Sequence, residues 1–240
     1  MPILGDNNVK GTFPSELGLL TRLERLDFDF NSLSGSLPVE ITSLKLLFFF
    51  WMFDNALTGS IPAETGNLES LGYVHFRNND LTGTVPTEMG RLSLLRFLDW
   101  GSNMLRGTIP TEMGNIPLAT TLDLNSNRLT GPIPSELGNL LVLDDLDLKN
   151  NDLSGPIPSE LGKLTLLEEL HLDGNRLQGV VPPEFANLQK LTILSIENNA
   201  LTGGVEDLFC DRIETPVESF SADCGGSSPP KVLCNCCTDC

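Results

Sequence analysis

The chain has 240 residues, of which 40% are hydrophobic, and it carries a formal net charge of −17 at pH 7. That hydrophobic content is enough for a packed core and argues against a largely disordered chain. The negative charge disfavours nucleic acid and anionic membrane surfaces as partners, because both attract basic proteins. The longest apolar run, 46–53, is less than half of the roughly 18 residues that a membrane-spanning helix needs, so we expect no membrane segment in this chain.

An asparagine recurs every 24 residues and marks an internal repeat that covers most of the chain. A glycine follows it four residues later each time, and a proline and a glutamate follow seven and nine residues later in every repeat but the last. A period of this length is typical of a solenoid, in which each repeat buries its apolar face only against its neighbours. The repeated asparagines are Asn7, Asn31, Asn55, Asn79, Asn103, Asn127, Asn151, Asn175 and Asn199.

The consensus LxxLxLxxNxLxGxIPxELGxL resembles the leucine-rich repeat. Its LxGxIPxELGxL half resembles the plant-specific subtype found in receptor-kinase ectodomains and polygalacturonase-inhibiting proteins. The resemblance implies an α/β fold, a right-handed solenoid with a parallel β-sheet on the concave face and 3₁₀ turns and short strands on the convex side. We expect a repeat array over residues 1–205 and a cysteine-rich C-terminal cap or tail over residues 206–240.

The repeated polar and special residues are expected to be structural. A ladder of buried asparagines would satisfy backbone groups at each turn. The glycine would permit a backbone conformation that a Cβ resists, and the proline would stiffen the crossing. Leucines such as Leu143, Leu146 and Leu148 should form the core. The column of glutamates from Glu16 to Glu184 is interpreted as solvated, with a cation-binding edge as the alternative.

All the cysteines lie in the C-terminal segment. Their even number and clustering indicate disulfides and an oxidising compartment, but the sequence does not choose among the pairings. Metal binding is the alternative because the run CNCCTDC (234–240) is dense in thiols, although it lacks a pair of CxxC knuckles. Disulfide-rich caps are usual in extracellular proteins of the family that the chain resembles, which implies an extracellular or cell-surface location. The six are Cys210, Cys224, Cys234, Cys236, Cys237 and Cys240.

The N-terminus offers no capping segment, because residue 1 already falls inside the first repeat's strand. A terminal repeat needs a cap to cover its apolar face. We therefore expect that N-terminal sequence is missing, with a partner that covers this end as the alternative. Missing sequence would also account for the lack of a visible signal peptide. No Asn-x-Ser/Thr glycosylation sequon occurs, which weakens the secreted interpretation without outweighing the clustered cysteines.

The run LLFFFWMFDN (46–55) is expected to be one strand with two faces. Its inward face should hold Leu47, Phe50 and Met52 as core. Its outward face should place Phe49, Trp51 and Phe53 on the concave sheet, the usual binding face of such solenoids. Trp100 occupies a core position of its repeat and is expected to pack rather than to recognise a ligand.

Outward positions of the neighbouring strands extend this surface into an aromatic patch and an acidic strip. Exposed aromatic patches mark contact sites, and Trp, Tyr and Arg are typical of binding hot spots. The alternative is that a missing N-terminal part, or a neighbouring chain, covers the patch. The candidate ligand-binding residues are Phe49, Trp51, Phe53, Tyr73, His75, Arg77 and Phe97 in the patch, with Asp99, Asp123 and Asp147 from the strip. The strip also contains Asp145, Glu169 and Asp173.

No catalytic, cofactor or metal site is expected. His75 should lie beside Asp99 on a neighbouring strand, but no GxSxG nucleophile elbow accompanies the pair. The expected function is non-enzymatic recognition of a protein, peptide or glycan by a receptor-like protein of signalling or defence. Alternatives are a secreted inhibitor of a cell-wall hydrolase and an ice-binding protein. Ser and Thr flank the repeated glycines as ice binding would need, but that column breaks at Arg106, Pro132, Pro156 and Val180.

Overall fold

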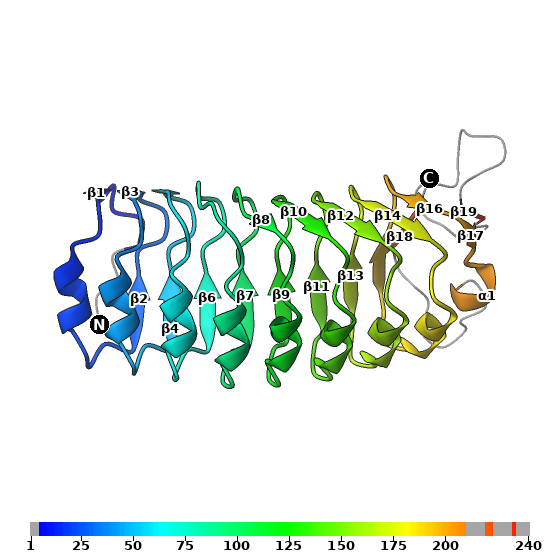
Figure 1. Ribbon diagram of the computed structural model, residues 1–240, viewed down its shortest axis with the longest axis horizontal. Helices are drawn as coiled ribbons and strands as arrows, with labels where there is room; N and C mark the ends of the chain where they lie inside the picture. Colours follow the sequence, from blue (N-terminus) through cyan, green and yellow to red (C-terminus); the bar gives the residue numbers. More distant parts are fainter. Residues whose placement is uncertain (1–4, 210–218, 223–231, 234–240) are drawn as a thin grey trace.

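The computed structural model describes residues 5–209, 219–222 and 232–233. Its repeats lie side by side along one long axis, and most of them contribute a strand, a turn and a 3₁₀-helix in the same order (Figure 1). The period of 24 residues seen in the asparagines is therefore also the structural period. The predicted right-handed solenoid, with parallel strands on its concave side and 3₁₀ turns on its convex side, is confirmed.

Nine parallel strands form the main sheet within the described residues. Up to β15 they pair without a slip in register, so residues one period apart lie opposite each other, as Phe49, Tyr73 and Phe97 do. Each outward position of the repeat therefore becomes a spatial row along the sheet. The strands are β2 (Arg25–Asp27), β4 (Phe49–Trp51), β6 (Tyr73–His75), β7 (Phe97–Asp99), β9 (Thr121–Asp123), β11 (Asp145–Asp147), β13 (Glu169–His171), β15 (Ile193–Ser195) and β18 (Ser219–Ser221).

The 3₁₀-helices cover the other side of the core. Each begins directly after a proline whose φ is fixed near the value that a helix start requires. In the described ranges they are η1 (Ser15–Leu19), η2 (Val39–Ser43), η3 (Ala63–Asn67), η4 (Thr87–Arg91), η5 (Thr111–Asn115), η6 (Ser135–Asn139), η7 (Ser159–Lys163) and η8 (Pro183–Asn187). A single turn of α-helix, α1 (Glu206–Phe209), follows the last complete repeat.

Short strands add small parallel sheets on the convex side, as expected. One sheet contains β1 (Lys10–Gly11), β3 (Ser32–Gly35) and β5 (Ala56–Leu57). A second contains β8 (Arg106–Gly107), β10 (Arg128–Gly131), β12 (Asp152–Gly155), β14 (Arg176–Gly179) and β16 (Ala200–Leu201). A third pairs β17 (Gly203–Gly204) with β19 (Val232–Leu233).

The asparagine ladder is buried from Asn79 to Asn199 and holds the turns, which confirms its structural interpretation there. Asn127 represents the column. Its Oδ1 accepts a hydrogen bond from the Leu105 N–H at 2.9 Å. Its Nδ2 donates to three carbonyl oxygens at 3.0–3.1 Å, those of Trp100, Leu124 and Asn125. One amide thus satisfies backbone groups of two consecutive repeats that the turn would otherwise leave unpaired.

One expectation about the C-terminal segment remains untested by the fold. The six cysteines lie outside the described residues, so their pairing stays a prediction. In the parts of the chain that are described, no helix has both the length and the apolar character that crossing a membrane requires.

Candidate binding face

The segment 47–53, which contains β4, presents two faces, as the sequence predicted. Leu47, Phe50 and Met52 are almost completely buried in the core. Phe49, Trp51 and Phe53 are only half-buried and lie on the concave side of the sheet. Trp100 is fully buried, stacked on Phe76 with ring centroids 6.1 Å apart, so it packs in the core as expected.

Aromatic rings from three neighbouring strands form one continuous surface, which we call the aromatic zone. It consists of Phe49, Trp51, Phe53, Tyr73, His75 and Phe97. Phe49 and Tyr73 stack with centroids 5.0 Å apart and planes 21° from parallel, and Tyr73 and Phe97 stack at 6.4 Å and 24°. The His75 ring lies 4.0 Å from the Phe53 ring at 24°. Because these rings stack on each other, they offer mainly their edges to a ligand.

Three further residues border the aromatic zone. They were not among the candidates predicted from the sequence. The Arg25 guanidinium lies 4.3 Å from the Trp51 ring centroid, within cation–π range. Phe30 packs edge-on against Phe53 at 4.9 Å and is about half exposed. Phe48 contacts Tyr73 at 5.5 Å, over Gly72, where a Cβ would collide with its ring. Arg25 and Phe30 lie six residues and one residue before the repeated Asn31, and comparing these two positions across the repeats for size and charge could have found both residues.

Beyond the aromatic zone lies a band of aspartates and cations, the polar belt, made of Arg77, Asp99, Asp123, Asn125, Asp147 and Lys149. Each aspartate uses Oδ1 to accept a hydrogen bond from the backbone N–H two residues later, at 2.8–3.1 Å. The other oxygen meets the side-chain donors. Arg77 Nη1 lies 2.9 Å from Asp123 Oδ2, and Lys149 Nζ lies 2.9 Å from Asp147 Oδ2. Asn125 Nδ2 bridges Asp123 and Asp147.

Three members of the acidic strip have little exposed surface, and their role in ligand binding stays a prediction. Asp99, Asp123 and Asp147 are 6%, 9% and 6% exposed. Arg77 reaches over Gly101 to Asp123, and a Cβ on Gly101 would lie 2.9 Å from Arg77 Nη1. The missing side chain at this position thus lets a cation cover acids on two neighbouring strands.

Burial and crowding change how these acids titrate. Burial, followed by repulsion from Asp99, raises the pKa of Asp123 to about 7, although Arg77 and a hydrogen bond from the Asn125 backbone oppose the shift. At the far end of the sheet, burial and then the neighbouring Asp27 raise the pKa of Asp29 to about 6. The concave face therefore changes its charge in the range from mild acidity to neutrality.

The two histidines each lie beside an acid. His75 Nε2 is 3.0 Å from Asp99 Oδ2, close enough for an ion pair but not aligned as a hydrogen bond. Asp99 Oδ2 also lies 3.7 Å from Arg77, so the His75–Asp99 pair connects the aromatic zone to the polar belt. His171 Nε2 lies 3.2 Å from Glu169 Oε2. Among the described residues, no group of three His, Cys, Asp or Glu is arranged to hold a metal ion.

A different group of acids gathers at the edge of the sheet where β11 and β13 begin, and we call it the edge acid cluster. Its members are Asp144, Asp145, Glu168 and Glu169. Asp145 pairs directly with Glu169 across the strands, a like-charge contact that destabilises a sheet. Burial, then Glu169 and Asp147, raise the pKa of Asp145 to about 6. Burial and then Glu168 also raise the pKa of Asp144.

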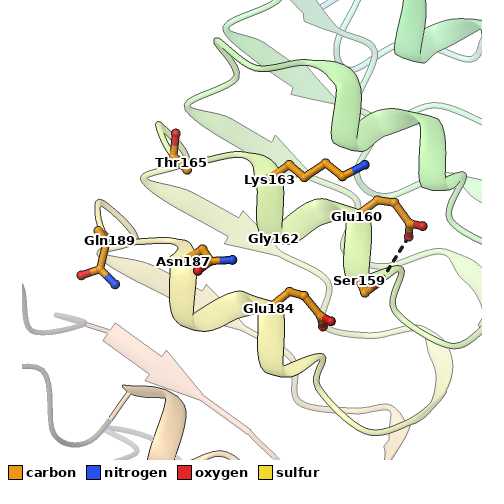
Figure 2. A pocket seen from close by; sticks show the side chains of 8 residues that line it. All are labelled: Ser159, Glu160, Gly162, Lys163, Thr165, Glu184, Asn187 and Gln189. Carbon is orange, nitrogen blue, oxygen red and sulfur yellow. Dashed lines mark hydrogen bonds between the residues drawn. The ribbon is translucent and has the colours of Figure 1, made fainter.

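The convex side has hollows of another kind. One of about 480 Å³ opens between η7 and η8, and Figure 2 shows its lining. A second hollow, of about 580 Å³, lies between 60 and 106, and one of about 490 Å³ recurs at the equivalent place between 108 and 158. Because these two recur with the repeat and the first is lined by acidic, basic and neutral residues together, we assign no site to them. The first is lined by Ser159, Glu160, Gly162, Lys163, Thr165, Glu184, Asn187 and Gln189.

Comparison with known proteins places this geometry among leucine-rich repeats. The sequence matches the Leucine Rich Repeat family over residues 22–44, 119–140, 143–164 and 166–188. A TDR receptor structure is 33% identical, with a TM-score of 0.84, over 86% of this chain and 36% of that one. The Arabidopsis receptor kinase HAESA, in complex with the peptide hormone IDA and the co-receptor SERK1, is 27% identical with a TM-score of 0.88, over 97% of this chain and 40% of that one.

A plant ice-binding protein is similar as well, at 28% identity and a TM-score of 0.76, over 92% of this chain and 71% of that one. The comparison with curated proteins returned no match. The chain spans well under half of the length of the two receptor structures. The repeat sequence, the parallel sheet and these neighbours agree: the chain contains leucine-rich repeats and is similar to plant receptor-kinase ectodomains.

Proposed function

We propose that this protein is a non-enzymatic recognition module that binds a peptide, or an extended segment of a protein, through the concave face of its main sheet. The observation that carries the proposal is the aromatic zone, a continuous half-exposed surface in a chain with only 6% aromatic residues. Large rings held by their neighbours give contact area at little cost in conformational entropy. A half-exposed aromatic surface of this kind is typical of binding sites.

The similar receptors support a peptide ligand. The HAESA structure contains a peptide hormone, and another similar structure is described as a plant peptide hormone receptor in complex with RGF2. The ring geometry favours a peptide over a glycan, because sugars usually lie flat on an exposed ring face. Here Tyr73 is stacked between Phe49 and Phe97, which leaves edges that suit aliphatic side chains and carbonyl oxygens. We further propose an extracellular location, as in those receptors.

Replacing Trp51 and Tyr73 together by alanine tests the proposal. Peptides are first selected against the wild-type protein from a phage-displayed random library, and their affinity is then measured for each variant. We expect Trp51→Ala/Tyr73→Ala to raise the Kd by about 30-fold or more, which corresponds to the roughly 2 kcal/mol of a hot spot. Val180→Ala is the control, because Val180 is also apolar and is 55% exposed on the convex side.

Two outcomes would contradict the proposal. One is a library that yields no peptide binding the folded wild-type protein. The other is a set of peptides that bind the double variant as tightly as they bind the wild type. A protein partner that uses an extended segment, such as a hydrolase inhibited by this chain, would depend on the same two residues.

Ice binding is a second candidate, favoured by the similarity to a plant ice-binding protein. The column of hydroxyls beside the repeated glycines runs from Thr12 to Thr108, and its side chains pack over the glycine of the next repeat. It then gives way to Pro132, Pro156 and Val180, so nearly half of the array lacks it. Thermal hysteresis in a solution of the wild-type protein would favour this candidate, and its absence would exclude it.

A further inference from the structure

We infer that the concave face selects peptides with two features, an apolar side chain that contacts the aromatic zone and a basic side chain about four to six residues away that contacts the edge acid cluster. This inference rests on the proposed function and adds the chemical pattern of the ligand. It is carried by one row of the main sheet, formed by the first residues of consecutive strands. In order, the row is Phe49, Tyr73, Phe97, Thr121, Asp145 and Glu169.

The row changes from apolar to acidic side chains, with only Thr121 of β9 between Phe97 and Asp145. All six of its side chains are half-buried on the concave side, so each keeps an accessible surface. Neighbouring strands lie about 4.8 Å apart, which places Asp145 about 14 Å and Glu169 about 19 Å from Tyr73. An extended peptide covers about 3.3 Å per residue. A peptide that crosses the strands along this row therefore spans the distance in about four to six residues.

The charges along the row favour a basic group at its acidic end. In the polar belt, each aspartate already has a cation or an amide beside it. Of the four acids in the edge acid cluster, only Glu169 has an ion-pair partner within the described residues, and this partner is His171. Asp145 Oδ1 is shielded from solvent and has no hydrogen-bond partner there. A guanidinium or ammonium group would relieve the repulsion between Asp145 and Glu169 and supply the missing donor.

An organic cation fits this cluster better than a metal ion does. No metal-holding group of three His, Cys, Asp or Glu occurs in the described parts of the chain, this edge included. The continuity of the cluster with the aromatic zone also points to a ligand long enough to touch both. A peptide with a basic side chain supplies an organic cation and is long enough to reach the aromatic zone, whereas a free metal ion does neither.

The experiment compares peptide selections on four proteins. They are the wild type, Asp145→Asn/Glu169→Gln, Trp51→Ala/Tyr73→Ala, and the matched control Glu136→Gln/Glu160→Gln, which makes the same change of charge on convex helices η6 and η7. One selected peptide and its analogue with the basic residue replaced by glutamine are then synthesised, and Kd is measured by fluorescence anisotropy. The melting temperature of each variant is recorded, and the isosteric edge variant should melt no lower than the wild type because it loses a repulsive pair.

We expect peptides selected on the wild type to carry Arg or Lys at the stated spacing from an apolar residue. Asp145→Asn/Glu169→Gln should raise the Kd for the synthetic peptide by about tenfold or more, as expected for the loss of a hydrogen bond between charged groups. The glutamine analogue should bind this edge variant and the wild type equally well. Peptides selected on the edge variant should lose the preference for a basic residue, and the control variant should behave as the wild type.

Three outcomes would overturn the inference, and they distinguish it from the proposed function. If the selected peptides depend on Trp51 and Tyr73 but show no spaced basic residue, the inference fails and the proposed function stands. If they depend on neither pair of residues, both fail. If Ca²⁺ raises the melting temperature of the wild type but not of the edge variant, the cluster is a metal site and the inference fails.

Discussion

Asn127 makes four hydrogen bonds with one buried amide, and the other asparagines of the ladder show why the position is invariant within the chain. Trp100 and Leu105 of one repeat, and Leu124 and Asn125 of the next, depend on that amide. A side chain that lacks both the donor and the acceptor, such as alanine, would leave these backbone groups unpaired in the core. Such groups cannot turn to water, so their desolvation is uncompensated.

Asn127→Ala should therefore lower the free energy of unfolding by about 2–3 kcal/mol. Chemical denaturation followed by circular dichroism measures the change. The control is Asn187→Ala, because Asn187 is an exposed asparagine at the end of η8, and it should cost less than about 0.5 kcal/mol. Equal effects of the two substitutions would show that the ladder contributes no more than surface asparagines do.

The acids of the strip show that the repeat pattern predicts the position of a side chain but not its exposure. The repeat placed Asp99, Asp123 and Asp147 on the concave side, and the structure agrees with that placement. Their low exposure depends on where Arg77 and Lys149 turn, and on Gly101 leaving room for Arg77 to cross. The Arg77–Asp123 and Asn125–Asp147 contacts join residues 46 and 22 positions apart, and they depend on side-chain rotamers. A residue's position in the repeat predicts which side of the sheet it lies on. The direction in which its long side chain extends over that side depends on the neighbouring side chains.

At the scale of elements, neighbouring 3₁₀-helices approach each other through a repeated glycine. A Cβ on Gly138 in η6 would lie 2.4 Å from the Glu160 carbonyl oxygen in η7. The equivalent position in η2 is Thr42, and η2 packs less closely against η3 than the other helices of the row pack against theirs. The spacing of these elements is thus set by the absence of a side chain as much as by the core.

Gly138→Ala is expected to push η6 and η7 apart and to destabilise the fold by about 1–3 kcal/mol, the usual cost of overpacking. The drop in melting temperature measures the effect. Asn139→Ala, at an exposed position of the same helix, serves as the control. If Gly138→Ala melts at the wild-type temperature, the contact with Glu160 does not limit how closely these helices pack.

The elements themselves were largely predictable from the repeat. A strict period fixes the register of the main sheet, because every strand meets its neighbour one period later, and the proline column marks where each 3₁₀-helix begins. The same reasoning placed Phe49, Trp51 and Phe53 on one side of their strand. It could not give the stacking of Tyr73 between Phe49 and Phe97, because ring orientation follows from packing between strands.

At the scale of the whole molecule, the acids of the concave face make stability depend on pH in an unusual sense. Asp29, Asp123 and Asp145 have pKa values of about 6, 7 and 6, raised above the ordinary value first by burial. An acid whose pKa is higher in the folded than in the unfolded chain takes up a proton on folding between the two values. Its protonation therefore stabilises the fold as the pH falls from about 7 to about 4, and that stability is lost as the pH rises.

We expect the melting temperature to be higher near pH 5 than near pH 8. Allowing for solvent screening of these partly buried groups, the gain should be on the order of 2 kcal/mol, or about 4–8 °C for a chain of this size. Differential scanning calorimetry across this range measures it, and Asp123→Asn/Asp145→Asn should flatten the dependence. A melting temperature that falls steadily on acidification would mean that the fold does not raise the pKa values of these acids.

The central claim is that the ligand lies across the concave sheet on the aromatic zone. Photo-crosslinking of a library-selected peptide to the wild-type protein, with the attachment sites located by mass spectrometry, tests it most directly. We predict attachment within residues 48–53 and 72–77, which contain β4 and β6 and the side chains that follow them. Attachment confined to the convex helices, such as η6 to η8, would contradict the account.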